Sequence, residues 1–390
     1  MTTESLEVRD LTSVDHDQAF GVRTRSFGKL DDSMREWWDS LQDGLIAQRR
    51  LIGVFDGGRL VAQVKSRPFQ QFWGGRAVPM SGIAGVVVAP EYRGRGVASL
   101  MMRAIAERSV ELGDFVSALY PATVAPYRRT GWEVVGAQTR ITIDSHHLRG
   151  LGAPDVFLRP GAKTDVRRVQ ELLEARYTTD RANGPKLLTT SEIAEALGDD
   201  ETFSYFTDDG FVLYQWQDHD LLVTAMVAPS GESARALWGV VGSGSSVAKK
   251  VHAFVSPDDP VHLLLPEEVA HEARHTRWML RLLDASKAMS ARGFPDAVSG
   301  AAKLIIEDPM LPGCDGAWVL EVHGGLGSLT RAAAGGQALR IGPKGLACLY
   351  SGSPMQVLRT AGLATAGSPT DDAFLDSAFG GRMPYLLEYF

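Results

Sequence analysis

A glycine-rich and basic segment is the part of this sequence best suited to chemistry. It comprises Val86, Val87, Val88, Arg93, Gly94, Arg95, Gly96, Val97 and Ala98. The three valines predict a buried strand, and Gly94 and Gly96 leave the backbone N–H groups of the following turn open to an anion. Arg93 and Arg95 add fixed positive charge, and a helix beginning at Val97 would point its positive dipole end at the same place. The segment therefore predicts a loop that binds a diphosphate.

The residues after this loop have the period of an amphipathic helix. Their apolar side chains share one helical face: Val97, Leu100, Met101, Ala104, Ile105 and Leu112. Gly113 then favours a helix end. The loop has neither the Gly-Lys-Ser/Thr ending of a P-loop nor the third glycine of a Rossmann dinucleotide fingerprint. The order of strand, loop and helix thus predicts a phosphate site of a different kind.

The spacing Arg93-x-x-Gly96-x-Ala98 resembles the coenzyme A pyrophosphate loop of the GCN5-related N-acetyltransferases. The resemblance continues downstream, where the segment 125–133 is similar to the Tyr-x-x-x-Gly-aromatic segment of that superfamily. It implies that acetyl-CoA is the acetyl donor. It also implies that the backbone N–H groups of residues 86–88 bind the thioester and pantetheine, and that Tyr127 protonates the departing thiolate.

The overall composition narrows the class of protein. The chain has 390 residues, of which 44% are hydrophobic, so two or three domains are expected. A formal net charge of −7 argues against a nucleic-acid partner. Cys314 and Cys348 lie far apart without metal-ligand spacing, so neither a disulfide framework nor a metal site is expected. The N-terminal residues lack a signal peptide, and no apolar segment could span a bilayer, so we expect a cytoplasmic protein with no membrane partner.

Three units divide the sequence. Residues 1–148 alternate predicted helices and strands around the diphosphate loop, and residues 155–276 repeat such a start after a Gly/Pro-rich linker but contain no second loop of this kind. In this second unit we expect strands at 236–240 and 261–265 and a helix at 243–254. Residues 277–390 form the third unit, which resembles the sterol carrier protein fold. The predicted fold class is α+β.

Two tandem acetyltransferase-like units followed by a sterol-carrier-like domain resemble the enhanced intracellular survival (Eis) family over essentially the full length. The resemblance implies a homohexameric, acetyl-CoA-dependent N-acetyltransferase whose substrates are aminoglycosides and other polyamines. It also implies that the C-terminal carboxylate, here on Phe390, reaches the active site of the first unit.

The resemblance then gives roles to individual residues. Tyr127 is the candidate general acid, because a phenol with a pKa near 10 is protonated at neutral pH. Tyr120 is the alternative. The Phe390 carboxylate is the candidate base or cation anchor, and the apolar residues before it predict that the chain end is docked rather than frayed. Since an unperturbed terminal carboxyl is a weak base, burial would have to raise its pKa.

The expected substrate pocket involves Trp37, Glu36 and Glu388, of which the tryptophan would form an aromatic wall and the two carboxylates would supply negative charge. Trp37 and Trp38 occupy adjacent helical positions, so they cannot both face the pocket, and we expect core packing to take one of them.

Two other classes of function stay open. A same-class alternative is an acetyltransferase for a protein lysine or for a single dedicated metabolite. A different alternative is a non-catalytic protein that binds coenzyme A, or that carries a lipid in its third domain.

Overall fold

The computed structural model describes residues 6–31, 34–153, 155–265, 270–333 and 337–390. Helices and strands alternate in its first part: β1 (Leu6–Asp10), α1 (His16–Phe27), α2 (Arg35–Ala47), β2 (Leu51–Asp56), β3 (Arg59–Trp73), β4 (Arg76–Val88), α3 (Val97–Glu111), β5 (Val116–Leu119), α4 (Ala125–Arg129), β6 (Glu133–Asp144) and α5 (Ser145–Arg149). Strands β1 to β5 are hydrogen-bonded in chain order, and only β4 and β5 run parallel.

The second part repeats this arrangement with different loops. It contains β7 (Arg159–Pro160), α6 (Val166–Thr179), α7 (Thr190–Gly198), β8 (Thr202–Phe206), β9 (Phe211–Gln217), β10 (Asp220–Val227), α8 (Gly231–Gly242), β11 (Lys250–Val255), α9 (Val261–Leu264) and β12 (Ala270–Leu282). Strands β10 and β11 are parallel, as β4 and β5 are. The three expectations stated for this unit are wrong. Residues 236–240 lie in helix α8 rather than in a strand, residues 250–255 form strand β11 rather than part of a helix, and residues 261–264 form a helix rather than a strand.

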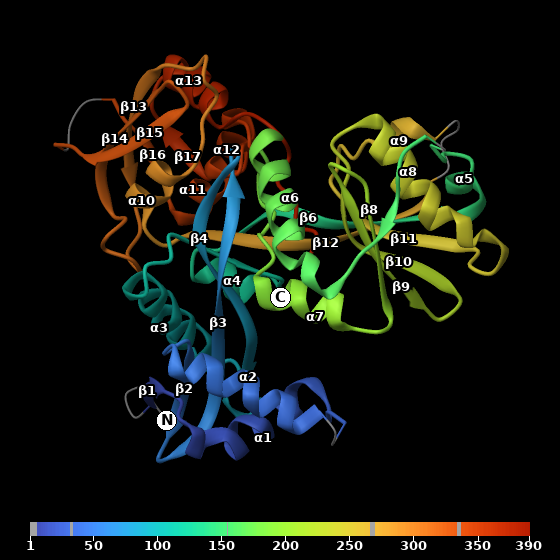
Figure 1. Cartoon of the computed structure of the whole chain (residues 1–390). Coiled ribbons are helices and arrows are strands. Elements are labelled where there is room, and N and C mark those ends of the chain that lie inside the picture. The colour runs from blue at the N-terminus through green and yellow to red at the C-terminus, as the bar shows by residue number, and fades with distance from the viewer. Residues whose placement is uncertain (1–5, 32–33, 154, 266–269, 334–336) are drawn as a thin grey trace.

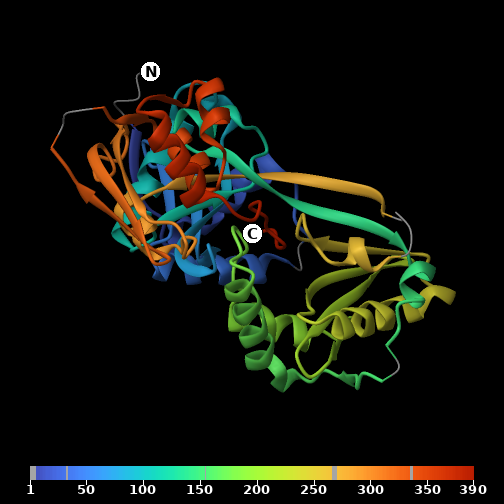
Figure 2. The same cartoon turned by 90° about the horizontal axis from the view of Figure 1, so that it is seen from above.

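Strands β6 and β12 join the two parts into one twelve-stranded sheet (Figures 1 and 2). The end of β12 pairs with β5, and its residues 270–280 pair with β6. The second half of β6 pairs with β11. The boundary expected between residues 276 and 277 therefore falls inside a strand of this sheet. Alternating side chains reveal that a segment is a strand, but they do not reveal which distant strand it pairs with.

A third lobe follows β12. Its described elements are α10 (Ala285–Ala291), β13 (Gly300–Ile306), β14 (Gly316–His323), β15 (Leu326–Arg331), β16 (Leu339–Ile341), α11 (Pro343–Tyr350), α12 (Met355–Thr360), β17 (Ala364–Ala366) and α13 (Pro369–Phe379). The strands form a separate five-stranded sheet in the order β15-β14-β13-β16-β17. The chain then returns to the centre of the molecule, where its last residue lies between the three lobes (Figures 1 and 2). None of the described helices has the length and apolar character needed to cross a membrane.

Candidate active site

Strands β4 and β5 separate in the middle of the first unit. They pair only between residues 80–83 of β4 and 116–119 of β5. Beyond Ile83, β4 continues for five residues, of which Ala84, Val87 and Val88 pair with β3 on one side, while no described strand pairs with them on the other. A bulge at Gly85 and Val86 adds to the irregularity. The backbone groups of residues 84–88 on the open side are therefore free to bind an extended ligand such as the pantetheine arm.

The predicted diphosphate loop lies at the end of β4 and has the backbone conformation that its glycines allow. Gly94 and Gly96 have φ angles of +75° and +81°, in the left-handed region that side chains disfavour. Gly96 is the N-cap of the fifteen-residue helix α3. Arg93 donates through Nε to the carbonyl of Val88 at 3.2 Å, and it is exposed, as is Arg95. The free N–H groups and the helix dipole fit a diphosphate here.

The second unit lacks this loop. Its residues Val227-Ala228-Pro229 correspond in sequence to Val88-Ala89-Pro90, but α8 begins only two residues after Pro229, at Gly231. In the first unit, α3 begins seven residues after Pro90, at Val97. The shorter connection has neither the two left-handed glycines nor the two arginines, so it offers no comparable site for a diphosphate.

A cavity of about 760 Å³ opens beside the free edge of β4. Most of its described lining comes from α1, α2, β3, β4, the segment after β5 and the end of the chain, and α4, α7 and β12 add one residue each. The lining includes Phe27, Met34, Trp37, Gln63, Val86, Tyr120, Tyr127, Tyr389 and Phe390. Phe27 and Trp37 are more than half exposed. Exposed large apolar side chains that gather around a cavity of this size are typical of a ligand site.

Tyr127 and Tyr120 both line this cavity but differ in how their hydroxyl groups are used. The Tyr120 hydroxyl donates to the carbonyl of Glu388 at 2.9 Å, and its ring stacks on Tyr389 with centroids 4.5 Å apart. The Tyr127 hydroxyl has no hydrogen-bond partner within the described part of the chain and is not fully enclosed. Burial, and to a lesser extent Tyr389, raises the pKa of Tyr127. Tyr127 therefore keeps its proton and can donate it to a bound group.

The end of the chain is held in place by hydrogen bonds to its backbone and by aromatic contacts. The Tyr385 backbone N–H donates to the carbonyl of Asn183 at 3.0 Å, and the Gln138 side-chain amide donates to the carbonyl of Leu387 at 2.8 Å. The Phe390 ring lies 5.4 Å from that of Phe69 and is only 7% exposed. The last residue of the sequence is thereby held against the cavity that Tyr127 lines.

The structure does not bring the two predicted substrate carboxylates into this cavity. Glu36 is exposed on α2 and is absent from the cavity lining, as is Glu388. The Oε2 atom of Glu388 is buried without a hydrogen-bond partner, and burial raises the pKa of this carboxyl to about 7 against the opposing effect of Lys186. Trp37 lines the cavity and is half exposed, whereas Trp38 also touches it but is buried in the core beneath α2.

Sequence reasoning missed three cationic residues of the cavity. Lys65 and Arg67 lie on β3 and Arg23 lies on α1, and all three line the cavity. A signal for two of them was present, because Gln63, Lys65 and Arg67 occupy alternate positions, which share one face when the segment is a strand. No such pattern exists for Arg23, which reaches the site from a different element.

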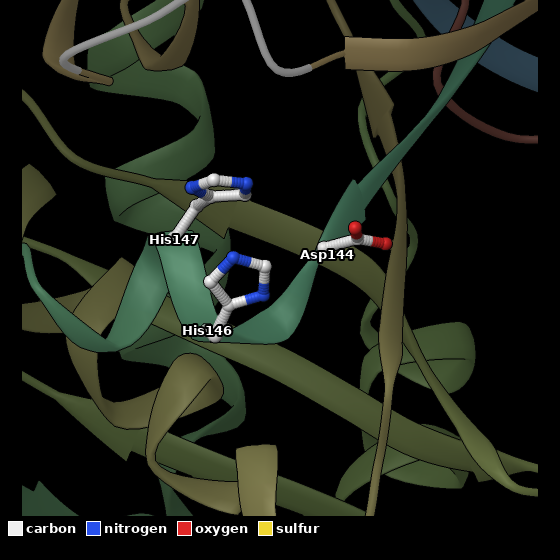
Figure 3. Close-up of side chains that lie close together, drawn as sticks. All are labelled: Asp144, His146 and His147. Carbon is white, nitrogen blue, oxygen red and sulfur yellow. The ribbon is translucent and has the colours of Figure 1, made fainter.

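One group of potential metal ligands lies elsewhere. The side chains of Asp144, His146 and His147 place ligand atoms within 4.8 Å of one another, where β6 leads into α5 (Figure 3). The two imidazole rings have centroids 3.9 Å apart. Helix α5 lies in the second lobe, on the side away from the end of the chain (Figures 1 and 2). None of the three residues lines the cavity.

Comparison with known proteins agrees with this architecture. Residues 7–135 match the model of an acetyltransferase (GNAT) domain, residues 193–282 match a second acetyltransferase (GNAT) model, and residues 285–387 match that of a sterol carrier protein domain. The chain is 47% identical to a GCN5-related N-acetyltransferase from Kribbella flavida over the full length of both chains, with a TM-score of 0.97.

Two curated relatives are more distant. The chain is 28% identical to the N-acetyltransferase Eis of Mycobacterium tuberculosis over 242 residues, which are 57% of this chain and 59% of Eis. It is 26% identical to an uncharacterized N-acetyltransferase of Streptomyces avermitilis, over 77% of this chain and 73% of that one.

The chain therefore belongs to the GCN5-related N-acetyltransferases. Within them it is of the Eis-like type, with two such units and a sterol-carrier-like domain in an α+β fold, which confirms the predicted class. GCN5-related N-acetyltransferases use acetyl-CoA.

Proposed function

We propose that this N-acetyltransferase moves the acetyl group of acetyl-CoA to a primary amine held in the cavity of the first unit. The observation that carries the proposal is the meeting of three features at one place: the open edge of β4, the free hydroxyl of Tyr127 and the docked end of the chain. The diphosphate loop ends the same strand, so one extended ligand could contact both.

The residues present fit coenzyme A. The N–H groups at the start of α3 would bind the diphosphate, with Arg93 and Arg95 adding positive charge, and the backbone of residues 84–88 would bind the pantetheine arm. When bound, acetyl-CoA supplies a thioester whose carbonyl carbon accepts a nucleophile. The strand edge contributes N–H groups that stabilise negative charge on the carbonyl oxygen.

Two groups of the protein would transfer the protons: the C-terminal carboxylate of Phe390 and the side-chain hydroxyl of Tyr127. The amine nitrogen forms a bond to the acetyl carbon while the carbon–sulfur bond breaks. The Phe390 carboxylate receives the proton that the amine loses, directly or through water, and Tyr127 gives its proton to the thiolate that leaves. Tyr127 suits this role better than Tyr120, because the hydroxyl of Tyr120 is already bound to the Glu388 carbonyl.

Aminoglycosides and other polyamines are the acceptors that the sequence resemblance to the Eis family implies, and a protein lysine or a single metabolite is the alternative of the same class. The test is thiol release from acetyl-CoA with a panel of amines and the product mass recorded. Measurable turnover would exclude a protein that only binds coenzyme A or a lipid. The proposed homohexamer is tested separately, by light scattering of the purified protein.

A second arm tests the proton donor. Tyr127→Phe is compared with Tyr120→Phe, which removes the other cavity hydroxyl. Loss of kcat in Tyr127→Phe with little change in the KM for acetyl-CoA supports the assignment. An unchanged kcat in Tyr127→Phe contradicts it.

A further inference from the structure

Three cations line the cavity that is proposed to receive the amine. Arg23 comes from α1, and Lys65 and Arg67 come from β3. Lys65 has no ion pair or hydrogen bond with any described residue. Burial, together with the charges of Arg67 and Arg23, lowers the pKa of Lys65 to about 8. These three groups therefore raise the local positive potential without a protein carboxylate that compensates for Lys65.

The nearby carboxylates do not neutralise this charge. The Glu192 carboxylate lies 2.9 Å from the Lys186 ammonium and 3.5 Å from the Arg67 guanidinium. Its closer ion pair is therefore with Lys186, which does not line the cavity. Glu388 does not line the cavity, and Glu195 lines it as an exposed residue of α7. Among the described residues, Arg67 has Glu192 within ion-pair distance, whereas Lys65 and Arg23 have no carboxylate that close.

Lys65 lies close to the reacting centre rather than at the rim. A Cβ atom added to Gly85 would lie 3.1 Å from Lys65 Cε, so the lysine chain packs directly over the bulge of β4. Gly85 itself lines the cavity and belongs to the stretch of β4 that is free on one side. An acceptor whose anionic group is bound by the Lys65 ammonium could therefore place a nearby amine of the same molecule at that edge.

Arg23 is held by a neutral partner, and Arg67 packs on an aromatic ring in addition to its 3.5 Å contact with Glu192. Arg67 lies over the ring of Phe69, 5.0 Å from its centroid, and Arg23 donates to the carbonyl of Gly28 at 2.6 Å. A carbonyl and an aromatic face orient a guanidinium without removing its charge. Both side chains are only partly exposed.

These cations do not serve the coenzyme A diphosphate. The loop 93–98 follows the end of β4, and none of its residues lines the cavity, whereas Trp37 and Phe390 do. Burying positive charge without a partner costs free energy, and a bound anion offsets that cost. A polycationic acceptor would instead add charge of the same sign.

Building on the proposed amine acetylation, we propose that the acceptor is not a polyamine but a primary amine that also carries an anionic group, a carboxylate or a phosphate, and that Lys65 and Arg67, assisted by Arg23, bind this group. Such acceptors include amino acids and phosphorylated amines. The three cations would orient the acceptor so that its amine points to the open edge of β4.

The test compares matched amines that differ in the anionic group. The pairs are free amino acids with their carboxamides, and O-phosphoethanolamine with ethanolamine, with spermidine as a polycation. The readout is the ratio of kcat/KM within each pair, for wild type, Lys65→Met, Arg67→Met and the control Lys303→Met. Lys303 is exposed on β13 in the third lobe. The two members of a pair differ in amine basicity, but equally for every variant.

The expected result is that wild type prefers the anionic member and that Lys65→Met reduces this preference about tenfold or more, as for a hydrogen bond to a charged group, while Lys303→Met leaves it unchanged. A wild type that prefers the neutral member or spermidine, or a preference that survives in both cavity variants, would overturn the proposal. The carboxylate and phosphate pairs distinguish the two sources of negative charge.

Binding of N-acetylated products by calorimetry separates this proposal from the proposed reaction. If the panel shows no turnover but the wild type binds N-acetyl amino acids more tightly than their amides and Lys65→Met does not, the anion site stands and the reaction fails. If amines are acetylated but no anionic product binds better than its amide, the anion site fails and the reaction stands.

Discussion

Replacing Glu388 by glutamine should stabilise the protein at alkaline pH and have little effect at acidic pH. The Glu388 carboxyl is buried near the Lys186–Glu192 ion pair, and its Oε2 atom has no hydrogen-bond partner in the described part of the chain. Burial raises the pKa of this carboxyl from 4.5 to about 7; Lys186 opposes the shift and Glu192 adds to it. Near neutral pH, the folded chain therefore binds a proton at Glu388 more strongly than the unfolded chain does.

The sign of the pH dependence follows from proton linkage. A carboxyl whose pKa rises on folding favours the folded state fully below its unfolded pKa, here near 4.5, and this benefit is lost as the pH rises through the folded value of about 7. At about 1.4 kcal/mol per pH unit, ionised Glu388 costs about 3 kcal/mol at pH 8 but below about 1 kcal/mol at pH 5. Glutamine does not ionise, so Glu388→Gln lacks this pH-dependent cost.

The assay is thermal unfolding of the full chain at pH 5, 6, 7 and 8 for wild type, Glu388→Gln and the control Glu174→Gln, an exposed residue of α6. We expect the Tm difference between Glu388→Gln and wild type to grow from pH 5 to pH 7 and to level off towards pH 8, and that of the control to stay flat. If the new amide lowers stability by an amount that does not depend on pH, the Tm difference shifts by the same amount at every pH and its dependence on pH is unchanged. A difference that is constant across this range, or largest at pH 5, would refute the reasoning.

Three further predictions concern the site. Tyr127→Phe should lower kcat by about 100-fold or more, the usual contribution of a general acid, in steady-state thiol release, with Tyr120→Phe affected less. Gly96→Ala forces a side chain into φ +81° at the N-cap of α3 and should raise the KM for acetyl-CoA, whereas Gly113→Ala, at φ +85° beyond the end of that helix, should lower Tm but leave this KM unchanged. Treatment with EDTA should leave the initial rate unchanged, because the cluster in Figure 3 does not line the cavity; a loss restored by added metal would contradict this.

The parts of the fold set by local sequence could be predicted. The strand, glycine loop and helix between residues 86 and 111 depend on neighbouring residues, and the structure places them as expected. The pairing of β6 and β12 could not be predicted, because it joins residues more than 100 positions apart. In the second unit, residues 236–240 form part of a helix because flanking residues on both sides continue its apolar face, which a five-residue window does not show.

The candidate site was predicted only where one segment supplied the signal. Tyr127 and Phe390 lie on the same cavity, and whether they act in catalysis stays a prediction. Glu36 and Glu388 were proposed from their position near aromatic residues, but proximity in sequence does not fix the direction of a side chain. The charge of the cavity was missed because Arg23 and Lys65 come from different elements, and only the folded chain brings them together.

The second unit contributes to the candidate active site although it has no diphosphate loop. Asn183 accepts a hydrogen bond from the Tyr385 N–H, and its side chain donates to the carbonyl of Arg382 at 2.9 Å. Lys186 is buried beside Glu388 and lies over the ring of Phe69, which contacts Phe390. The position of Phe390 in the first unit thus depends on residues of the second. This dependence gives the repeated unit a physical reason to be retained: it orders the end of the chain, which would otherwise lose conformational entropy with few contacts to offset the cost.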